Sequence, residues 1–139
     1  MFGLGHKARR RTDCLIDQLV GELRLHAPSF TSAVWLHADV DNAQVRTDIY
    51  VKYPDGRIVQ RRGGDRLRII VRELWSEFLL SGQGRWWGLT LQLGASGERQ
   101  VKYDYVDQSR PWLSPDVRRL AWISQNLPGG RAPHKHAAE

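Results

Sequence analysis

The chain has 139 residues, 41% of them hydrophobic and six of them Trp, which is enough for one domain with a buried core. Its single cysteine, Cys14, excludes an internal disulfide and a cluster of thiolate metal ligands. No apolar run approaches the roughly 20 residues that cross a bilayer, and the first residues lack the hydrophobic stretch of a secretory signal, so we expect a soluble, cytoplasmic protein.

The formal net charge of +6 is distributed unevenly along the chain. Residues 1–11 carry four basic side chains and no acidic one, whereas residues 12–56 have an excess of four acidic side chains. Residues 57–72 reverse the sign again, with six arginines against Asp65. The location of the charge tells more about partners than its total, so residues 57–72 are the first candidate for an anion-binding surface.

The first half of the chain predicts one helix and three strands. Residues 12–28 have apolar side chains at helical spacing, with polar residues at the start and a proline at the end. Apolar and polar residues then alternate over 34–40 and again over 45–53, which is typical of two half-buried strands. The Pro-Asp-Gly sequence at 54–56 is a turn signal, so residues 57–60 should pair back as a shorter third strand.

The second half predicts a helix, a hairpin and a final helix. Beyond the Gly-Gly corner at 63–64, apolar side chains recur at helical spacing from Leu67 to Phe78. Residues 86–93 and 100–107 alternate as two antiparallel strands joined by a glycine-containing turn. Residues 114–128 begin with Ser-Pro and end with Pro, which indicates a capped final helix. In this helix the residues that recur at helical spacing are Val117, Leu120, Ala121 and Ser124.

The order of elements is therefore helix, three strands, helix, two strands, helix. Runs of antiparallel strands separated by helices, rather than strict alternation, predict an α+β fold with one antiparallel sheet of about five strands and the helices packed on one face. The expected domain covers residues 12–127. A basic N-terminal arm at 1–11 precedes it, and a flexible tail at 128–139 follows it.

Candidate catalytic and metal-binding groups are sparse. His37 lies two residues from Asp39 on a predicted strand, but no serine, thiol or third group completes a catalytic set. His134 and His136 supply only two metal ligands, in the predicted tail. We therefore predict no catalytic residue, no cofactor and no resident metal.

The arginine-rich segment leaves two interpretations open. Arg57, Arg61, Arg62 and Arg66 lie on a short strand, a Gly-Gly corner and a helix start, where arginines can contact phosphate or an acidic protein surface. Arginine on an exposed edge strand also deters sheet-to-sheet aggregation, without any partner. The tryptophans could stack on bases, but tryptophan at periodic positions of a small domain usually belongs to the core.

Several motifs occur in a specific order. They are Trp87-x-Leu89-Thr90-x-x-Leu93, a turn ending in Gly97, Tyr103-Asp104-Tyr105-x-Asp107 and Arg119-x-x-Trp122. Together with the N-terminal helix, the Trp35-x-x-Ala38-Asp39 strand and the helix ending at Phe78, this order resembles the YezG-like immunity proteins, small bacterial antitoxins encoded beside polymorphic toxins. The likeness covers about residues 12–127.

The resemblance implies a non-enzymatic protein that binds the catalytic domain of a cognate toxin and blocks its active site. The toxin-binding candidates are Arg57, Arg61, Arg62 and Arg66, with Trp35, His37, Asp39, Asp48 and Tyr50 from the sheet face opposite the predicted core. Because the chain is basic, charge complementarity favours a toxin with an acidic face, for example an NAD-consuming enzyme, over a DNase. The alternative is a small nucleic-acid-binding domain that uses the basic N-terminal run and the same arginines.

Overall fold

The computed structural model describes residues 2–27, 29, 31–41, 44–105, 114–130 and 134–135. Its elements are α1 (Phe2–Leu25), β1 (Ala33–Asp41), β2 (Gln44–Lys52), β3 (Ile58–Arg62), α2 (Gly64–Leu80), β4 (Gly88–Gly94), β5 (Arg99–Asp104), α3 (Pro115–Asn126), the 3-10 turn η1 (Pro128–Gly130) and the short β6 (His134–Lys135). The predicted order of three helices and five antiparallel strands is confirmed, and with it the α+β class.

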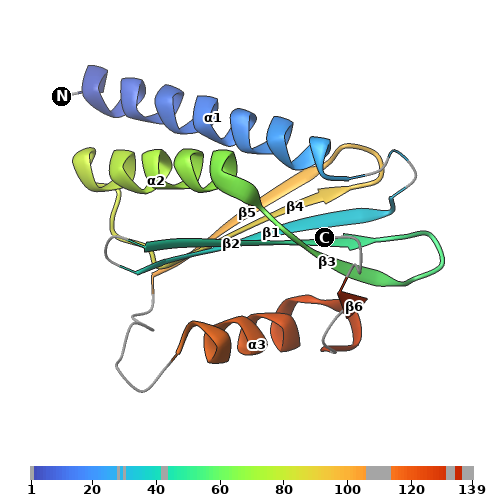
Figure 1. Ribbon diagram of the computed structural model, residues 1–139. Helices are drawn as coiled ribbons and strands as arrows, with labels where there is room; N and C mark the ends of the chain where they lie inside the picture. The colour runs from blue at the N-terminus through green and yellow to red at the C-terminus, as the bar shows by residue number, and fades with distance from the viewer. Residues whose placement is uncertain are drawn as a thin grey trace.

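The strands form one sheet in the order β5-β4-β1-β2-β3-β6 (Figure 1). The central strand β1 pairs with β2 along its whole length and with β4 on its other side. The pairing of β3 with β2 is shorter, because it covers only Asp48 to Lys52 of β2. The two residues of β6 lie parallel to β3, next to Val59 and Gln60. The first residues of β2 therefore extend past the end of β3 and form an edge of the sheet.

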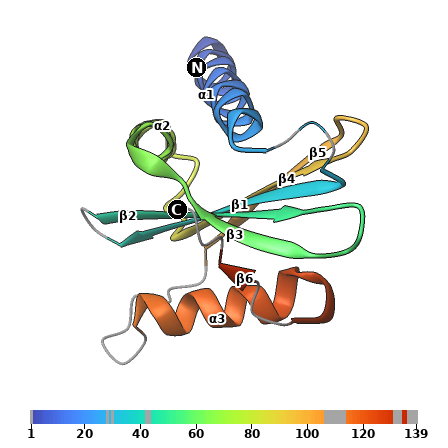
Figure 2. The ribbon, with the colours of Figure 1, turned by 45° about the vertical axis from the view of Figure 1, so that its right-hand side comes forward.

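The main core lies between one face of the sheet and the helices α1 and α2. The alternation of side chains along the strands places Leu36 of β1, Ile49 of β2 and Leu91 of β4 on this face, all fully buried. The two helices lie antiparallel across it (Figures 1 and 2) and bury their apolar stripes, including Leu19 and Leu74. The amphipathic patterns of residues 12–28 and 67–78 thus correspond to real packing surfaces.

The third helix requires a correction, because it does not share a face with the other two. Figure 2 shows α3 on the opposite side of the sheet from α1 and α2. Its buried residues are Arg118, Trp122 and Ile123, whereas Val117 and Leu120 are 46% and 54% exposed. The stripe at helical spacing is therefore the outer side of α3. The physical reason is that the second sheet face carries Trp35 and Tyr50 in a separate buried cluster, which α3 covers.

Some boundaries also differ from the predictions. The helix α1 begins at Phe2, so the basic run belongs to it. The strand β4 begins at Gly88, and Trp86 precedes it and packs with Phe78 in the main core. Within the predicted tail, Pro128–Gly130 form η1 and His134–Lys135 form β6. The predicted strand end at Asp107 and the histidine at 136 lie outside the described residues. No helix in the described part of the chain is long and apolar enough to cross a membrane.

Candidate binding surface

An aromatic cluster holds α3 against the sheet. The Trp122 ring stacks on His37, with ring centres 4.7 Å apart, and on Tyr50, with centres 5.0 Å apart. Its indole Nε1 donates a hydrogen bond to Thr90 Oγ1 at 2.8 Å. Trp122 therefore contacts three strands at once, β1, β2 and β4. Because the cluster also contains Trp35, the sheet face that sequence reasoning assigned to the surface is a second, smaller core.

A buried ion pair fixes the same helix. Arg118 Nε and a terminal nitrogen of the same guanidinium donate to the two carboxylate oxygens of Asp39, at 2.6 and 3.0 Å. The two side chains are 3% and 7% exposed, and Asp41 lies 3.9 Å from the same guanidinium. A bidentate pair of this kind sets both the position and the rotation of the helix, because guanidinium and carboxylate must be coplanar to form both bonds.

A pocket of about 470 Å³ opens next to this anchor, where β3 ends and α3 begins. We call it the arginine pocket. Its lining residues are His37, Asp39, Val45, Arg46, Thr47, Asp48, Arg62, Gly63, Arg68, Pro115, Asp116 and Arg119. The pocket exists because β3 stops at Arg62, opposite Asp48, so that the preceding residues of β2 have no strand beside them on that edge. The backbone instead turns through Gly63 into α2.

The turn at Gly63 is closely packed against the pocket wall. A Cβ atom at this position would lie 2.8 Å from Thr47 Cβ and 3.2 Å from a methyl carbon of Leu67, and it would overlap the Thr47 hydroxyl. Real Cβ atoms do not approach other atoms this closely. Glycine at 63 therefore allows β3 to pass directly into α2, which brings Arg62 and Arg68 to the same opening.

The charges around the pocket are only partly compensated within the molecule. Arg119 forms an ion pair with Asp116 at 3.7 Å, and Arg68 forms one with Asp65. Among the described residues, neither Arg46 nor Arg62 has an ion-pair partner within 4.0 Å. These two arginines leave positive charge at the mouth of the pocket.

Two pocket residues have shifted pKa values. Burial raises the pKa of Asp48, and the hydrogen bond that Gln60 Nε2 donates to it at 3.0 Å opposes the shift. Burial, with a smaller contribution from Arg118, lowers the pKa of His37 to about 4. Neutral imidazole is therefore the stable form of His37 at pH 7.

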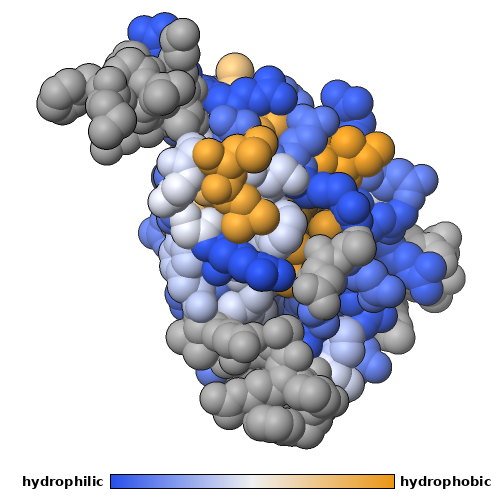
Figure 3. Space-filling view, turned by 90° about the vertical axis from the view of Figure 1, so that its left-hand side faces the viewer, coloured by the Kyte–Doolittle hydropathy of each residue, from blue (hydrophilic) through white to orange (hydrophobic). Residues whose placement is uncertain are grey.

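A shallower groove continues from the pocket along α2. It shares Val45, Arg46 and Arg68 with the arginine pocket and adds Ile69 and Arg72. Ile69 is 58% exposed. The exposed apolar residues of α2 are Ile69, Leu79 and Leu80. Figure 3 shows apolar side chains gathered in the upper part of the end face of the molecule, bordered by polar ones. The groove thus combines exposed guanidinium groups with apolar surface.

The predicted toxin-binding residues fall into three groups. His37, Asp39, Asp48 and Arg62 all line the arginine pocket. Trp35 and Tyr50 are 4% and 0% exposed beneath α3. Arg57, Arg61 and Arg66 lie outside the pocket. The structure therefore brings four of the nine candidates together around the pocket, but it also buries four of the nine: Trp35, Tyr50, His37 and Asp39.

The four predicted arginines do not form one corner. Arg61 and Arg62 point to opposite faces of β3, because successive side chains of a strand alternate. Arg61 donates to the backbone oxygen of His26 and to the hydroxyl of Tyr53, at 2.8 and 3.0 Å. It therefore ties β2 and β3 to the segment after α1.

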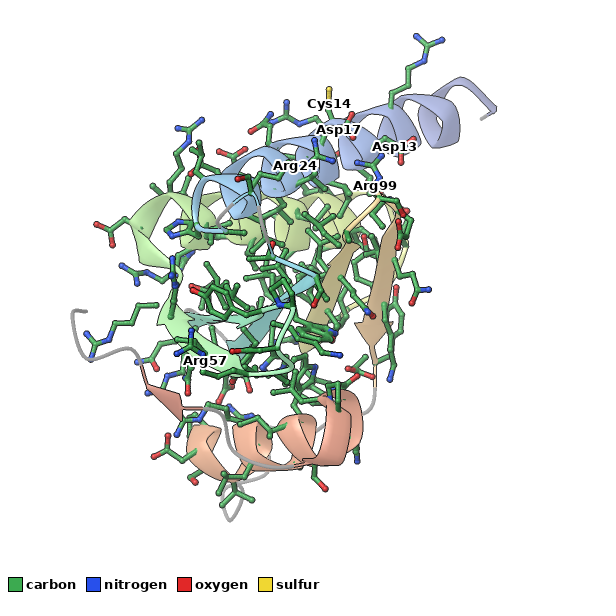
Figure 4. The ribbon with its side chains drawn as sticks, turned by 90° about the vertical axis from the view of Figure 1, so that its right-hand side faces the viewer. Asp13, Cys14, Asp17, Arg24, Arg57 and Arg99 are labelled. Carbon is green, nitrogen blue, oxygen red and sulfur yellow. The ribbon has the colours of Figure 1, made fainter. Side chains whose placement is uncertain are left out.

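The other two arginines are exposed. Arg57 lies over the Tyr53 ring, 4.9 Å from its centre, at the β2–β3 hairpin. Arg57 directly precedes β3, and Figure 4 shows it well away from Arg24 of α1. Arg66 pairs with Glu22 of α1 at 2.7 Å.

Sequence reasoning missed Arg46, Arg68 and Arg119 as pocket residues. The signal for Arg46 was present, because it lies two residues from Asp48 and so shares its face of the strand. No signal placed Arg119, since its position depends on which face of the sheet α3 covers. No group of three or more metal-ligating side chains occurs among the described residues.

This architecture, one sheet between two helical layers with a charged pocket and groove at its edge, defines a small α+β protein with a candidate binding surface. The comparison with known families identifies it further. Residues 31–138 match the family described as Immunity protein YezG-like, and the chain belongs to this family. The match supports an immunity role, a toxin partner and a non-enzymatic inhibitor. No curated protein matches the chain significantly. The match begins after α1, whereas the resemblance noted above begins at residue 12.

Proposed function

We propose that this chain neutralises a cognate bacterial toxin by binding its catalytic domain stoichiometrically and covering the active cleft. Membership of the YezG-like immunity family is the observation that carries the proposal. Inhibition is steric and electrostatic, and no turnover by this chain is involved. A stable interface of this kind buries on the order of 1,600 Å² in total and has a few arginine, aromatic or apolar anchors at its centre.

The arginine pocket and the adjoining groove supply such a surface. Arg46, Arg62 and Arg68 are exposed guanidinium groups, and Ile69 beside them offers exposed apolar area. Arg57 and Arg66 remain candidates for the rim, because both are exposed. Trp35, His37, Asp39 and Tyr50 support the interface indirectly, since they hold α3 and therefore the pocket wall in place.

The chemistry of this surface bears on the kind of toxin. Guanidinium groups at the centre of an interface require carboxylates or other acceptors on the partner. A nuclease that binds a phosphate backbone presents a basic cleft, which these arginines would repel. We therefore propose a non-nuclease toxin with an acidic face, for example an enzyme that consumes NAD.

The test is an affinity measurement with the catalytic domain of the toxin encoded beside this chain in its native genome. Both proteins are purified, and binding is measured by titration calorimetry alongside toxin activity. We expect one-to-one binding and complete inhibition. Replacing Arg57 and Arg62 by Glu should weaken binding tenfold or more, where each factor of ten corresponds to about 1.4 kcal/mol. Arg24→Glu, on the exposed end of α1, is the matched control and should have little effect.

The nucleic-acid alternative predicts a different salt dependence. Phosphate binding occurs on unrelated sequences and loses affinity steeply with added salt, whereas a complex with a buried protein interface retains most of its affinity. Failure of the wild-type chain to bind or inhibit the toxin domain, combined with salt-sensitive binding to unrelated DNA, would replace the proposed function by the alternative.

A further inference from the structure

We propose, on the basis of the function above, that the arginine pocket is the receptor for one carboxylate side chain of the toxin, clamped by Arg46 and Arg62. This goes beyond a general acidic face, because it assigns one place, one kind of group and two binding residues. The occupant is an aspartate or glutamate that projects from the toxin surface into the pocket.

The register of the sheet places the two guanidinium groups suitably. Arg62 of β3 is paired with Asp48 of β2, and Arg46 lies two residues before Asp48 on the same face. Arg46 and Arg62 are therefore diagonal neighbours across two antiparallel strands, and residues in such positions are separated by roughly 7–8 Å or somewhat less. Side chains of this length can reach a single carboxylate from both sides, and each guanidinium matches the two oxygens of a carboxylate.

The local charge balance favours an anion at this point. The carboxylate of Asp39 is occupied by Arg118, and Asp116 lies within ion-pair distance of Arg119. Asp48 accepts a hydrogen bond from Gln60 and carries the remaining carboxylate of the pocket lining. Arg46 and Arg62 together therefore exceed the remaining negative charge inside the pocket.

Some polar atoms in the pocket wall have unfilled hydrogen-bonding capacity. Three lining residues have a buried side-chain atom with no hydrogen-bond partner among the described residues: Nε2 of His37, Oγ1 of Thr47 and Nε of Arg119. His37 is only 2% exposed. A buried polar atom without a partner is unfavourable, so water or an incoming ligand must satisfy it.

The pocket is large enough to admit an acidic side chain. A volume of about 470 Å³ accommodates a carboxylate on a short stem together with several waters. The pocket opens beside the groove that contains Ile69, so the surrounding toxin surface can pack on the groove while the carboxylate enters. Such an arrangement, a desolvated charged anchor surrounded by near-neutral contacts that exclude water, is typical of strong interfaces.

The test uses the full chain and the purified catalytic domain of the toxin. The double variant Arg46→Gln/Arg62→Gln removes both charges while keeping polar side chains of similar reach, and Arg24→Gln is the matched control. We expect the pocket variant to bind at least tenfold more weakly at 0.15 M and at 0.5 M salt, and the control to bind within about twofold of wild type. Thermal unfolding of each variant checks that the fold is retained.

A complementary scan on the toxin identifies the carboxylate. Each exposed Asp or Glu of the toxin domain is changed to Asn or Gln. One of these toxin variants should bind the wild-type immunity chain more weakly than the unchanged toxin does. The same toxin variant should bind the pocket variant as well as the unchanged toxin does, as expected for a coupled pair. If the pocket variant binds the toxin as tightly as the wild-type chain does at 0.5 M salt, the two arginines act only through general electrostatic attraction, and the clamp is refuted. Undiminished binding by the pocket variant, while the wild-type chain inhibits the toxin, would refute the clamp and leave the proposed function standing.

Discussion

At the scale of single residues, His37 shows how strongly the position of a side chain in the fold changes its pKa. Its ring is 2% exposed and lies against Trp122, with Asp39 and Asp48 on the same sheet face and Arg118 on the helix above. Burial removes the water that would stabilise an imidazolium ion, and the Arg118 charge acts in the same direction, so the pKa falls to about 4. The same residue on an exposed strand would titrate near pH 6.5.

The consequence is a stability that depends on pH. The folded pKa of His37 is below the unfolded value, so the unfolded chain binds the proton first as the pH falls. The free energy of unfolding should therefore decrease by about 2 kcal/mol between pH 7 and pH 5. The raised pKa of Asp48 acts in the opposite direction, because the folded chain binds a proton at this carboxyl more readily than the unfolded chain does. Urea unfolding of wild type and His37→Phe checks the prediction, since the variant should lose most of the decrease. An identical slope in both proteins would assign the effect to other groups.

At the scale of elements, α3 determines what the second sheet face does. The helix contributes Trp122 and Ile123 to the smaller core and Arg118 to the buried ion pair. It also forms one wall of the arginine pocket through Pro115, Asp116 and Arg119. One helix therefore both closes a core and forms a wall of the pocket, so its docking energy and the shape of the pocket are coupled.

Substitutions on the two sides of α3 should have very different effects. Trp122→Ala removes both ring stacks and the hydrogen bond to Thr90, and should destabilise the fold by about 3–5 kcal/mol. Leu120→Ala, at a site that is 54% exposed, should change stability by less than about 0.5 kcal/mol. Chemical denaturation gives both values, and hydrogen exchange within α3 reports whether the helix detaches. Equal losses for the two variants would contradict the observed rotation of the helix.

At the scale of the whole molecule, α1 closes the main core although it precedes the residues that match the family. The buried side chains that it contributes are Leu15, Ile16, Leu19, Val20 and Leu23, each at most 6% exposed. An ion pair at its border is partly exposed: Arg99 of β5 reaches Asp17 of α1 at 2.6 Å, and the two side chains, labelled in Figure 4, are 44% and 63% exposed. Such exposed pairs add little, so the apolar contacts hold the helix.

This predicts that the domain cannot fold without α1. A chain lacking residues 1–30 should lose its cooperative unfolding transition and expose apolar surface to a hydrophobic dye, because the main core would face water. Leu19→Ala, in the intact chain, should destabilise the fold by about 2–5 kcal/mol, whereas Leu25→Ala, at a site 79% exposed, should have a negligible effect. A truncated chain that remained monomeric and unfolded cooperatively would show that α1 is dispensable.

The sequence by itself determined the elements and their order. The alternation along β1 and β2 separated core-facing from opposite-facing residues correctly, and the apolar spacing from Leu67 to Phe78 identified the buried side of α2. These periodicities arise from local backbone geometry, two residues per strand repeat and 3.6 per helical turn, so a single sequence contains them.

Only the tertiary structure decided which surface is exposed. The sequence of α3 offers two stripes, and its buried stripe includes an arginine, because the carboxylate that compensates Arg118 lies 79 residues away on β1. The same contact places Arg119 at the pocket and buries Trp35 and Tyr50, which sequence reasoning assigned to the interface. The reason is physical: burial of a charged side chain depends on its partner, and a partner distant in the chain is found only when the sheet and the helix meet.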